Sequence, residues 1–377
     1  MNQPAVVFAG GGTAGHVNPL LSTVAALKNT GLEFVPLVLG TKEGLESELV
    51  PAAGLEFLTI PRLPMPRRPS PDLMRLPVRL RRTVKELEEL FAERGVKALV
   101  GFGGYVSTPA YMAARRLKIP FLVHEQNARP GMANKLGARW ANTVALTFPG
   151  TPLKALHGKT EVTGLPLRPE ILDLAARLGD SEARVLARTA AAEFFGLDAG
   201  RPTVLVTGGS LGALFLNQTL PSALLKVSET VPDLQVVHLT GKGKAAEVSD
   251  FVTESGLGDR YKVLDYLTEM HHALALADAV VCRAGAATVA ENSALGIPAL
   301  YVPLPVGNGE QALNARGVVE ASGAFLLNQK KADPTAVAES VAAMLDPERN
   351  AAMRASAAVA GTTRGAANLA ELIKEVL

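Results

Sequence analysis

Residues 5–21 are AVVFAGGGTAGHVNPLL, and this stretch decides the fold. The five apolar residues Ala5–Ala9 predict a buried parallel strand that ends at three glycines. Asn18 and Pro19 then form a good helix start, since Asn caps helices and Pro suits the first helical position, and the helix is predicted to run to Asn29. A strand, a glycine turn and a helix in this order are typical of Rossmann-like α/β domains.

Short apolar runs alternate with longer helical segments along the rest of the chain. Further buried strands are predicted at residues 34–39, 98–102, 121–124, 203–207, 235–240, 279–282 and 299–302. The second half opens with a glycine loop of its own, GGSLGA at residues 208–213. Two such arrays in series predict an α/β protein with two doubly wound domains and parallel sheets, residues 1–165 and 166–354. The C-terminal helix, at about residues 355–377, is expected to pack back on the first domain.

Composition limits the classes of function. The 377 residues are 48% hydrophobic and 20% charged, which is enough to bury two cores. The formal net charge of +2 argues against a dedicated nucleic-acid binder, and the single cysteine, Cys282, excludes an internal disulfide. The N-terminus lacks the basic region of a signal peptide, and no apolar stretch reaches the ~20 residues of a spanning helix. The sequence therefore predicts a soluble or peripheral cytoplasmic protein.

The first glycine loop satisfies G-x-G-x-x-G, so a nicotinamide or flavin site is one alternative and a purely structural turn is another. A dinucleotide site needs an acidic residue at the end of the second strand, whereas the chain has Gly40 and Thr41 there, with Glu43 the nearest acid. Glycine-loop amides also suit phosphate, and the candidate phosphate-binding glycines are Gly12, Gly209 and Gly212. Two loops that face one another across an interdomain cleft would suit a two-substrate enzyme.

Five motifs, in order, resemble the MurG family of N-acetylglucosaminyltransferases. They are GGGTAGHVNPLL (10–21), GFGGYVSTPAYMAA (101–114), HEQNARPGMANK (124–135), GGSLGALFLN (208–217) and CRAGAATVAENSALGIPALYVP (282–303). The resemblance implies a GT-B fold, in which two Rossmann-like domains face each other. It also implies an inverting transfer of GlcNAc from UDP-GlcNAc to the C4 hydroxyl of MurNAc in undecaprenyl-pyrophosphoryl-MurNAc-pentapeptide. That reaction converts lipid I to lipid II and completes the peptidoglycan precursor.

The leading candidate for the catalytic base is His16, at the end of the first glycine loop. A helix N-terminus disfavours the charged imidazole, and a neutral imidazole can take a proton from a sugar hydroxyl. The alternatives are a histidine that only caps the loop, a histidine that positions a ligand, or Glu125 as the base or as the group that orients His16. The resemblance also places Thr13, Ala14 and Gly15 near the donor and the acceptor.

The resemblance assigns the remaining substrate-binding residues. Asn127 would form hydrogen bonds with a hydroxyl of the GlcNAc, although its side chain could instead support a turn. The other expected contacts are Arg168 and Ser210 with diphosphate, Leu267 with uracil, Ala286, Ala287 and Thr288 with UDP, Glu291 with the ribose, and Gln311 with GlcNAc. From residue chemistry alone, a mid-helix Glu such as Glu291 usually lies on a solvated helix face. The chain departs from the family at Leu165, usually Asn, and at Glu310, often Gln or His.

The sequence predicts no obligate metal, because the chain has no D-x-D triplet and no His/Cys cluster with the spacing of metal ligands, although a divalent cation could stimulate the reaction. An anionic membrane surface is an expected partner through the region Arg62–Arg82, where Leu63, Met65, Leu73 and Met74 would enter the interface. The expected location is the cytoplasmic face of the cell membrane, where other cell-wall synthesis proteins could bind. The competing interpretations are a UDP-GlcNAc 2-epimerase, another GT-B glycosyltransferase with a lipid acceptor, and a non-catalytic nucleotide-sugar binding protein.

Overall fold

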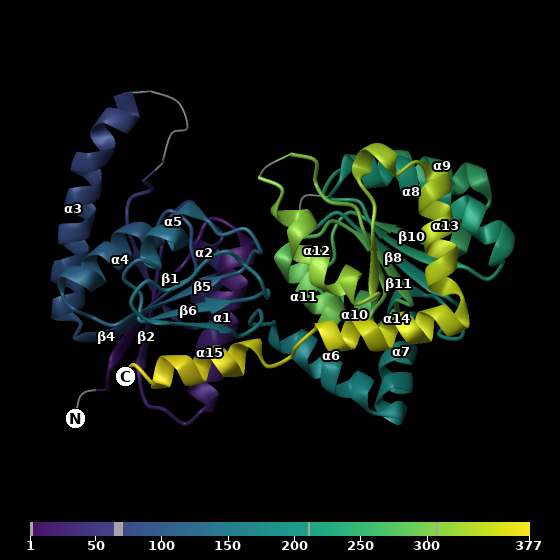
Figure 1. Cartoon of the computed structure of the whole chain (residues 1–377). Coiled ribbons are helices and arrows are strands. Elements are labelled where there is room, and N and C mark those ends of the chain that lie inside the picture. Colours follow the sequence, from purple (N-terminus) through teal and green to yellow (C-terminus); the bar gives the residue numbers. More distant parts are fainter. Residues whose placement is uncertain (1–2, 64–70, 210–211, 307) are drawn as a thin grey trace. The chain divides into compact units, whose positions relative to one another are not determined.

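The chain forms two compact units, each with a parallel sheet between layers of helices (Figure 1). The computed structural model describes residues 3–63, 71–209, 212–306 and 308–377. The N-terminal unit comprises Met1–Arg168 together with Arg364–Leu377, and the C-terminal unit comprises Pro169–Thr363. The chain therefore passes between the units twice.

The sheet of the N-terminal unit has seven strands in the order β3-β2-β1-β4-β5-β6-β7, all parallel. The strands are β1 (Ala5–Ala9), β2 (Val35–Gly40), β3 (Glu56–Thr59), β4 (Val96–Gly101), β5 (Phe121–Glu125), β6 (Thr143–Leu146) and β7 (Lys159–Val162). The helices are α1 (Ala14–Asn29), α2 (Glu46–Ala52), α3 (Pro71–Glu93), α4 (Ser107–Arg116), α5 (Met132–Gly137) and α15 (Gly365–Lys374). The strands predicted at residues 5–9, 34–39, 98–102 and 121–124 are confirmed to within two residues.

The sheet of the C-terminal unit has six parallel strands in the order β10-β9-β8-β11-β12-β13. They are β8 (Thr203–Thr207), β9 (Gln235–Leu239), β10 (Tyr261–Leu264), β11 (Ala279–Cys282), β12 (Ala299–Tyr301) and β13 (Ala324–Leu326). The α-helices are α6 (Pro169–Gly179), α7 (Ser181–Phe195), α8 (Leu214–Thr230), α9 (Ala246–Ser255), α10 (Met270–Leu276), α11 (Ala286–Ala294), α12 (Glu310–Glu320), α13 (Pro334–Leu345) and α14 (Pro347–Ala360). The four strands predicted in this half are all present.

In both sheets the order in which successive strands are added reverses at the first strand. The second and third strands continue on one side of it, and the fourth strand lies on the other side, next to β1 in one unit and next to β8 in the other. Helices that leave these two central strands cross to opposite faces, so a crevice opens at the carboxyl end of the sheet, where doubly wound proteins bind ligands. Each glycine loop follows the first strand of its sheet and therefore lies at this crevice.

The strands are buried on both faces, which explains their continuous apolar sequence. In β1, Val6 and Phe8 belong to the core beneath α1 and α15, whereas Val7 and Ala9 belong to the core beneath α3 and α4. Alternate residues of a strand point to opposite faces, so one five-residue run contributes to both cores.

Helix α1 begins earlier than the sequence analysis predicted. It starts at Ala14, with Thr13 at the N-cap position, and Pro19 lies inside it. The backbone N–H groups of His16 and Val17 already donate to the Thr13 carbonyl, so the glycine loop leads directly into the first turn. Pro19 removes only its own backbone donor, and its side chain is buried.

The predicted C-terminal helix at residues 355–377 is in fact two helices. Helix α14 ends at Ala360 in the C-terminal unit, and α15 begins at Gly365 in the N-terminal unit, where it packs against α1. Gly365 allows a close approach, because a Cβ there would overlap the Leu165 carbonyl oxygen. The Asn368 side chain donates to the Thr163 carbonyl at 3.0 Å, which fixes α15 to the segment that follows β7.

Candidate functional site

His16 lies where the first glycine loop enters α1. Its Nδ1 is 3.0 Å from the Gly11 carbonyl oxygen and 3.3 Å from the Thr13 hydroxyl. A carbonyl oxygen can only accept a hydrogen bond, so Nδ1 donates its proton to Gly11. In the neutral ring, Nε2 is then the nitrogen without a proton, which is the form that a general base requires.

The loop after β4 borders the Nε2 side of the ring. Gly103 has a φ of +90°, and a Cβ at this position would lie 3.4 Å from Nε2 of His16. Gly104 has a φ of +81° and lies against the Gly11 carbonyl. A pocket of about 300 Å³ opens here, lined by the glycine loop together with Thr41, Arg62 and Tyr105. The two glycine-rich motifs of this unit therefore meet at one pocket.

A buried acid that the sequence analysis did not single out, Glu46, lies under the first glycine loop. Its carboxylate accepts from the Gly12 N–H, the Thr41 N–H and the Thr41 hydroxyl, each at 2.9 Å. Burial acts to raise the pKa of this carboxyl, but the hydrogen bonds from Gly12 and Thr41 outweigh it and hold the pKa below its ordinary value. The N–H of Gly12, one of the predicted phosphate-binding glycines, thus donates to a carboxylate in this structure.

The HEQN segment, residues 124–127, lies at the end of β5 and leads into a turn around Glu125. This carboxylate is 2% exposed and accepts from the Asn127 N–H at 3.0 Å, the Gly131 N–H at 2.9 Å and the Asn134 amide at 2.9 Å. The buried Tyr111 hydroxyl donates to the other end of the Asn134 side chain, at 2.9 Å. The geometry thus gives Glu125 the part of shaping the turn that carries Asn127, while the Gly11 carbonyl orients His16.

Residues 163–168, which follow β7 and precede the C-terminal unit, are packed tightly. The Nε2 atom of His124 donates to the Gly164 carbonyl at 3.2 Å, and complete burial lowers the pKa of this histidine to about 4. Leu165 is 3% exposed, so an apolar side chain occupies this position in the core. Arg168, the last residue before the chain first enters the C-terminal unit, is half-buried.

The second glycine loop follows β8 in the C-terminal unit. Gly209 and Gly212 have φ values of +82° and +68°, conformations that favour glycine. A Cβ on Gly212 would also overlap the Thr240 carbonyl oxygen, so the loop lies directly on the end of β9. Ser210, the predicted phosphate ligand, lies outside the described residues.

A buried polar chain supports this loop. The Asn217 side chain donates to the Thr240 carbonyl at 3.0 Å and accepts from Nε2 of His238 at 3.2 Å. The Tyr261 hydroxyl donates to Nδ1 of His238 at 2.8 Å. Burial lowers the pKa of His238 to about 3, so the ring is neutral and its two nitrogens have different partners. The sequence analysis missed this chain because its members come from three separate elements.

The other predicted donor-binding residues lie at the carboxyl edge of the same sheet. They are Leu267 after β10, Ala286, Ala287 and Thr288 in the first turn of α11, Glu291 further along α11, and Gln311 at the start of α12. The first turn of a helix presents unpaired N–H groups to an anion. The Gln311 side chain accepts from the Leu304 N–H at 2.9 Å. Thr13–His16 and Asn127, in contrast, belong to the N-terminal unit.

Two charged side chains at this edge have buried polar atoms that lack a hydrogen-bond partner within the described part of the chain. They are Nε of Arg283, which follows β11, and Oε2 of Glu310. Nη1 of Arg283 donates to the carbonyls of Val302 and Pro303, and burial lowers the pKa of this guanidinium.

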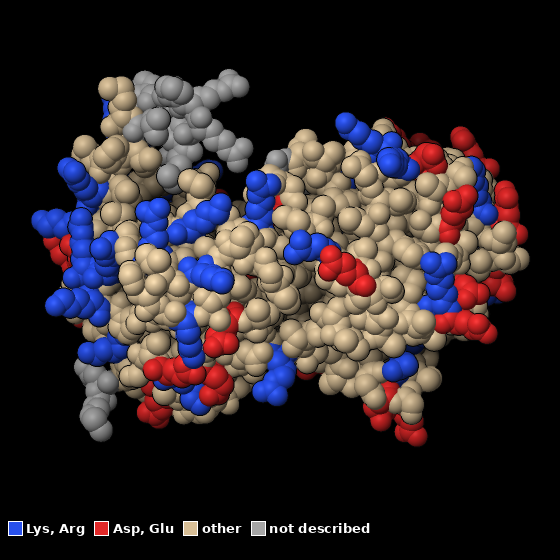
Figure 2. Space-filling view, in the orientation of Figure 1, with Lys and Arg blue, Asp and Glu red and all other residues tan. Residues whose placement is uncertain are grey.

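The predicted membrane surface is only partly as expected. Leu63 is 4% exposed and thus part of the core, so the prediction that it enters a membrane is wrong. Met65 and the Leu73 side chain lie outside the described residues, whereas Met74 and Val78 on α3 are 83% and 70% exposed. Further along α3, the apolar stripe of Val84, Leu87 and Phe91 packs on the sheet. Lys and Arg side chains gather over the flank of the N-terminal unit where α3 lies (Figure 2).

Comparison with known proteins gives one consistent family. Residues 6–146 match the glycosyltransferase family 28 N-terminal domain, and residues 203–373 match its C-terminal domain. The chain is 48% identical over 372 residues to the UDP-N-acetylglucosamine–N-acetylmuramyl-(pentapeptide) pyrophosphoryl-undecaprenol N-acetylglucosamine transferase of Clavibacter sepedonicus, covering 98% of this chain and 96% of that protein. It is also 48% identical to the transferase of the same name from Leifsonia xyli subsp. xyli, with 98% of each chain covered.

A solved structure agrees with these relatives. The crystal structure of MurG from Acinetobacter baumannii superimposes with a TM-score of 0.79 at 27% sequence identity, over 99% of this chain and 100% of that one. The family models match both domains, the solved MurG structure matches nearly the whole chain, and the fold is GT-B. The chain belongs to the MurG family of glycosyltransferase family 28.

Proposed function

We propose that this chain transfers GlcNAc from UDP-GlcNAc to the C4 hydroxyl of MurNAc in undecaprenyl-pyrophosphoryl-MurNAc-pentapeptide, with inversion at the sugar. The observation that carries the proposal is the 48% identity, over 98% of the chain, to transferases whose names state the donor and the lipid-linked acceptor. The same observation stands against an epimerase, which would need no lipid-linked acceptor.

In the proposed reaction His16 is the general base. The C4 oxygen attacks the anomeric carbon of GlcNAc while Nε2 of His16 takes the hydroxyl proton, and the bond from the anomeric carbon to the UDP oxygen breaks. UDP leaves with the bonding electrons. The hydrogen bond from Nδ1 to the Gly11 carbonyl supports this assignment, because it leaves Nε2 free to accept the proton. Asn127, presented by the turn around Glu125, would hold a sugar hydroxyl.

The donor would bind to the C-terminal unit. The N-terminal turn of α11 and the loop with Gly209 and Gly212 suit the diphosphate, together with Ser210 and Arg168, and Glu291 suits the ribose. Leu267 would contact the uracil, and Gln311 would contact the sugar. Amides, a helix N-terminus and an arginine supply the positive charge in this scheme, so we propose that no metal is obligatory, while a divalent cation could stimulate the reaction.

The acceptor is a lipid, so the enzyme would work as a peripheral protein at the cytoplasmic face of the membrane. No helix in the described ranges is long and apolar enough to cross a bilayer. The exposed side chains of Met74 and Val78 lie beside exposed Arg75, Arg81 and Arg82 on α3, a combination suited to anionic lipid head groups. Other cell-wall synthesis proteins could meet the enzyme on the same membrane.

The test is transfer of radiolabel. Purified protein is incubated with labelled UDP-GlcNAc in detergent, with and without the lipid-linked MurNAc-pentapeptide, and the products are separated. Label in the lipid fraction only when acceptor is present is the expected result. Donor binding without transfer would indicate a binding protein, and label in UDP-ManNAc would indicate an epimerase.

A further inference from the structure

The first glycine loop is built around the side chain of Glu46. A Cβ at Gly11, Gly40 or Gly44 would overlap this side chain, so a glycine of the first loop, the last residue of β2 and a glycine of the loop after β2 leave the space that it occupies. The carboxylate has no measurable exposure to solvent and receives three hydrogen bonds from Gly12 and Thr41. Removal of one acceptor oxygen would leave a buried N–H unpaired, which is costly.

Glu46 and His16 hold adjacent parts of the same loop. One carboxylate oxygen accepts from the Gly12 N–H, and the carbonyl of the preceding residue, Gly11, accepts from Nδ1 of His16. The Gly11 carbonyl and the Gly12 N–H belong to one planar peptide group, so a hydrogen bond on one side fixes the direction of the other. Glu46 thereby aims the carbonyl that determines which nitrogen of His16 carries the proton.

We propose that Glu46 is a positioning residue for catalysis: it fixes the Gly11–Gly12 peptide, and through it the tautomer and direction of His16. The inference rests on the proposed function, in which His16 is the base. It also explains why the G-x-G-x-x-G sequence does not form a dinucleotide site here. The internal carboxylate takes the N–H that would face a pyrophosphate, and its negative charge would repel one.

The test compares Glu46→Gln with Glu48→Gln. Gln keeps the volume of Glu46 but turns one acceptor oxygen into a donor that faces the N–H of Gly12 or Thr41. Glu48 is exposed on the same helix, so its substitution makes the same change of charge without touching the loop. Two quantities are measured: the ¹⁵N chemical shifts of the His16 ring, assigned with His16→Ala, and the kcat and KM for GlcNAc transfer.

For Glu46→Gln we expect loss of the single Nδ1–H tautomer signature and a fall in kcat on the order of 10- to 100-fold. The KM for UDP-GlcNAc should change far less than kcat, because most of the proposed donor contacts lie in the other unit. Glu48→Gln should match the wild type in both. A wild-type His16 spectrum together with a wild-type kcat in Glu46→Gln would overturn the proposal.

Two further results distinguish a failure of the Glu46 proposal from a failure of the proposed function or from misfolding of the variant. If the wild-type protein transfers no GlcNAc, the proposed function fails, while the His16 spectrum still tests the link to Glu46. If Glu46→Gln does not fold by circular dichroism, the same measurements are made on Glu46→Asp, which keeps the charge but is too short to reach Gly12 and Thr41 together. A normal spectrum and a normal kcat in that variant would also refute the link.

Discussion

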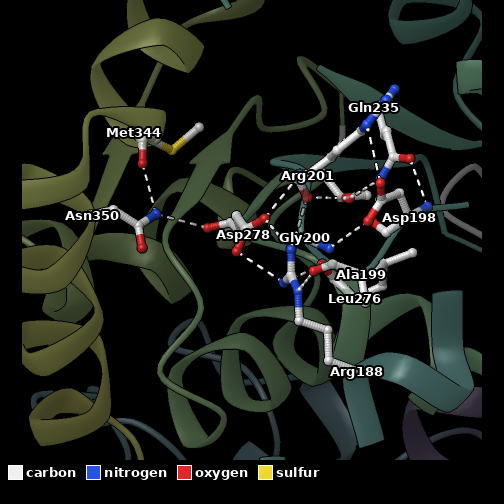
Figure 3. Close-up of polar contacts among 11 residues, drawn as sticks. Arg188, Asp198, Ala199, Gly200, Arg201, Gln235, Leu276, Asp278, Met344 and Asn350 are labelled. Carbon is white, nitrogen blue, oxygen red and sulfur yellow. Dashed lines mark hydrogen bonds and ion pairs between the residues drawn. The ribbon is translucent and has the colours of Figure 1, made fainter. Parts of the chain in front are cut away.

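A single arginine joins α7 to the amino-terminal end of the C-terminal sheet. Arg188 forms a two-pronged ion pair with Asp278, at 3.0 and 2.8 Å, and also donates to three backbone carbonyls (Figure 3). These carbonyls are those of Ala199 at 2.6 Å, Leu276 at 2.8 Å and Arg201 at 2.9 Å. The guanidinium thus uses all its nitrogens to tie together the segments that precede β8 and β11.

The cost of losing this side chain follows from its burial. The Arg188 and Asp278 side chains are 23% and 26% exposed. Breaking a fully buried ion pair costs about 3–5 kcal/mol, and an exposed pair contributes about 0–1 kcal/mol. A half-buried pair such as this one should fall between the two. Asp278 keeps its hydrogen bond from the Thr203 N–H at 2.9 Å, and water can reach the freed carbonyls. We therefore expect Arg188→Met to cost about 2–3 kcal/mol, since Met preserves the aliphatic part of the side chain.

The assay is native-state hydrogen exchange followed by mass spectrometry. A loss of about 2–3 kcal/mol corresponds to exchange that is about 30- to 160-fold faster in peptides from β8 and β11, at 1.36 kcal/mol per tenfold. Peptides from β1, in the N-terminal unit, serve as the internal reference. Arg316→Met is the matched control, because the Arg316 side chain is 53% exposed and its ion pair with Glu320 is long, at 3.9 Å, so its loss should cost little. Acceleration below about threefold in β8 and β11, or equal acceleration in β1, would refute the reasoning.

Three further predictions concern the candidate site and its support. His16→Ala should lower kcat for GlcNAc transfer by about 10²- to 10⁴-fold, with UDP-GlcNAc affinity by calorimetry unchanged; near-normal kcat would exclude it as the base. Gly212→Ala should weaken UDP-GlcNAc binding by at least about tenfold, because the new Cβ meets the Thr240 carbonyl, whereas Gly256→Ala, with a φ of +73° in open space, should bind normally. The pKa of His238 falls on folding from 6.5 to about 3, so the unfolded chain binds the extra proton between these pH values. The free energy of unfolding of the C-terminal unit should therefore decrease as pH falls through this range, by up to about 1.4 kcal/mol per pH unit. Urea titrations of His238→Gln should lack this contribution, and an unchanged slope would contradict the assignment.

The central strands could be predicted from the sequence because they are buried on both faces. The apolar runs at Ala5–Ala9, Thr203–Thr207 and Ala279–Cys282 coincide with β1, β8 and β11. Strands at or near the sheet edges were missed: β7 (Lys159–Val162) has mainly exposed side chains and therefore no apolar run to detect.

The candidate site was predictable only where it is local in sequence. The glycine loop with His16 could be found because turn and side chain are contiguous. The contact of Glu46 with Gly12 spans 34 residues and exists only because α2 folds back over the loop, which no short motif encodes. The burial of Leu63 likewise depends on the packed structure, since its neighbours in sequence are Arg and Pro.

The place of α15 in the N-terminal unit has a consequence for synthesis on the ribosome. Leu369, Ala370 and Ile373 are fully buried against the first sheet. The two larger side chains, Leu369 and Ile373, together contribute about 3–6 kcal/mol of hydrophobic stabilisation. That is a large share of the roughly 5–15 kcal/mol that stabilises a typical domain. The N-terminal unit is thus completed only after the C-terminal unit has been translated, and until α15 has been made the nascent chain carries an uncovered apolar face that chaperones can recognise.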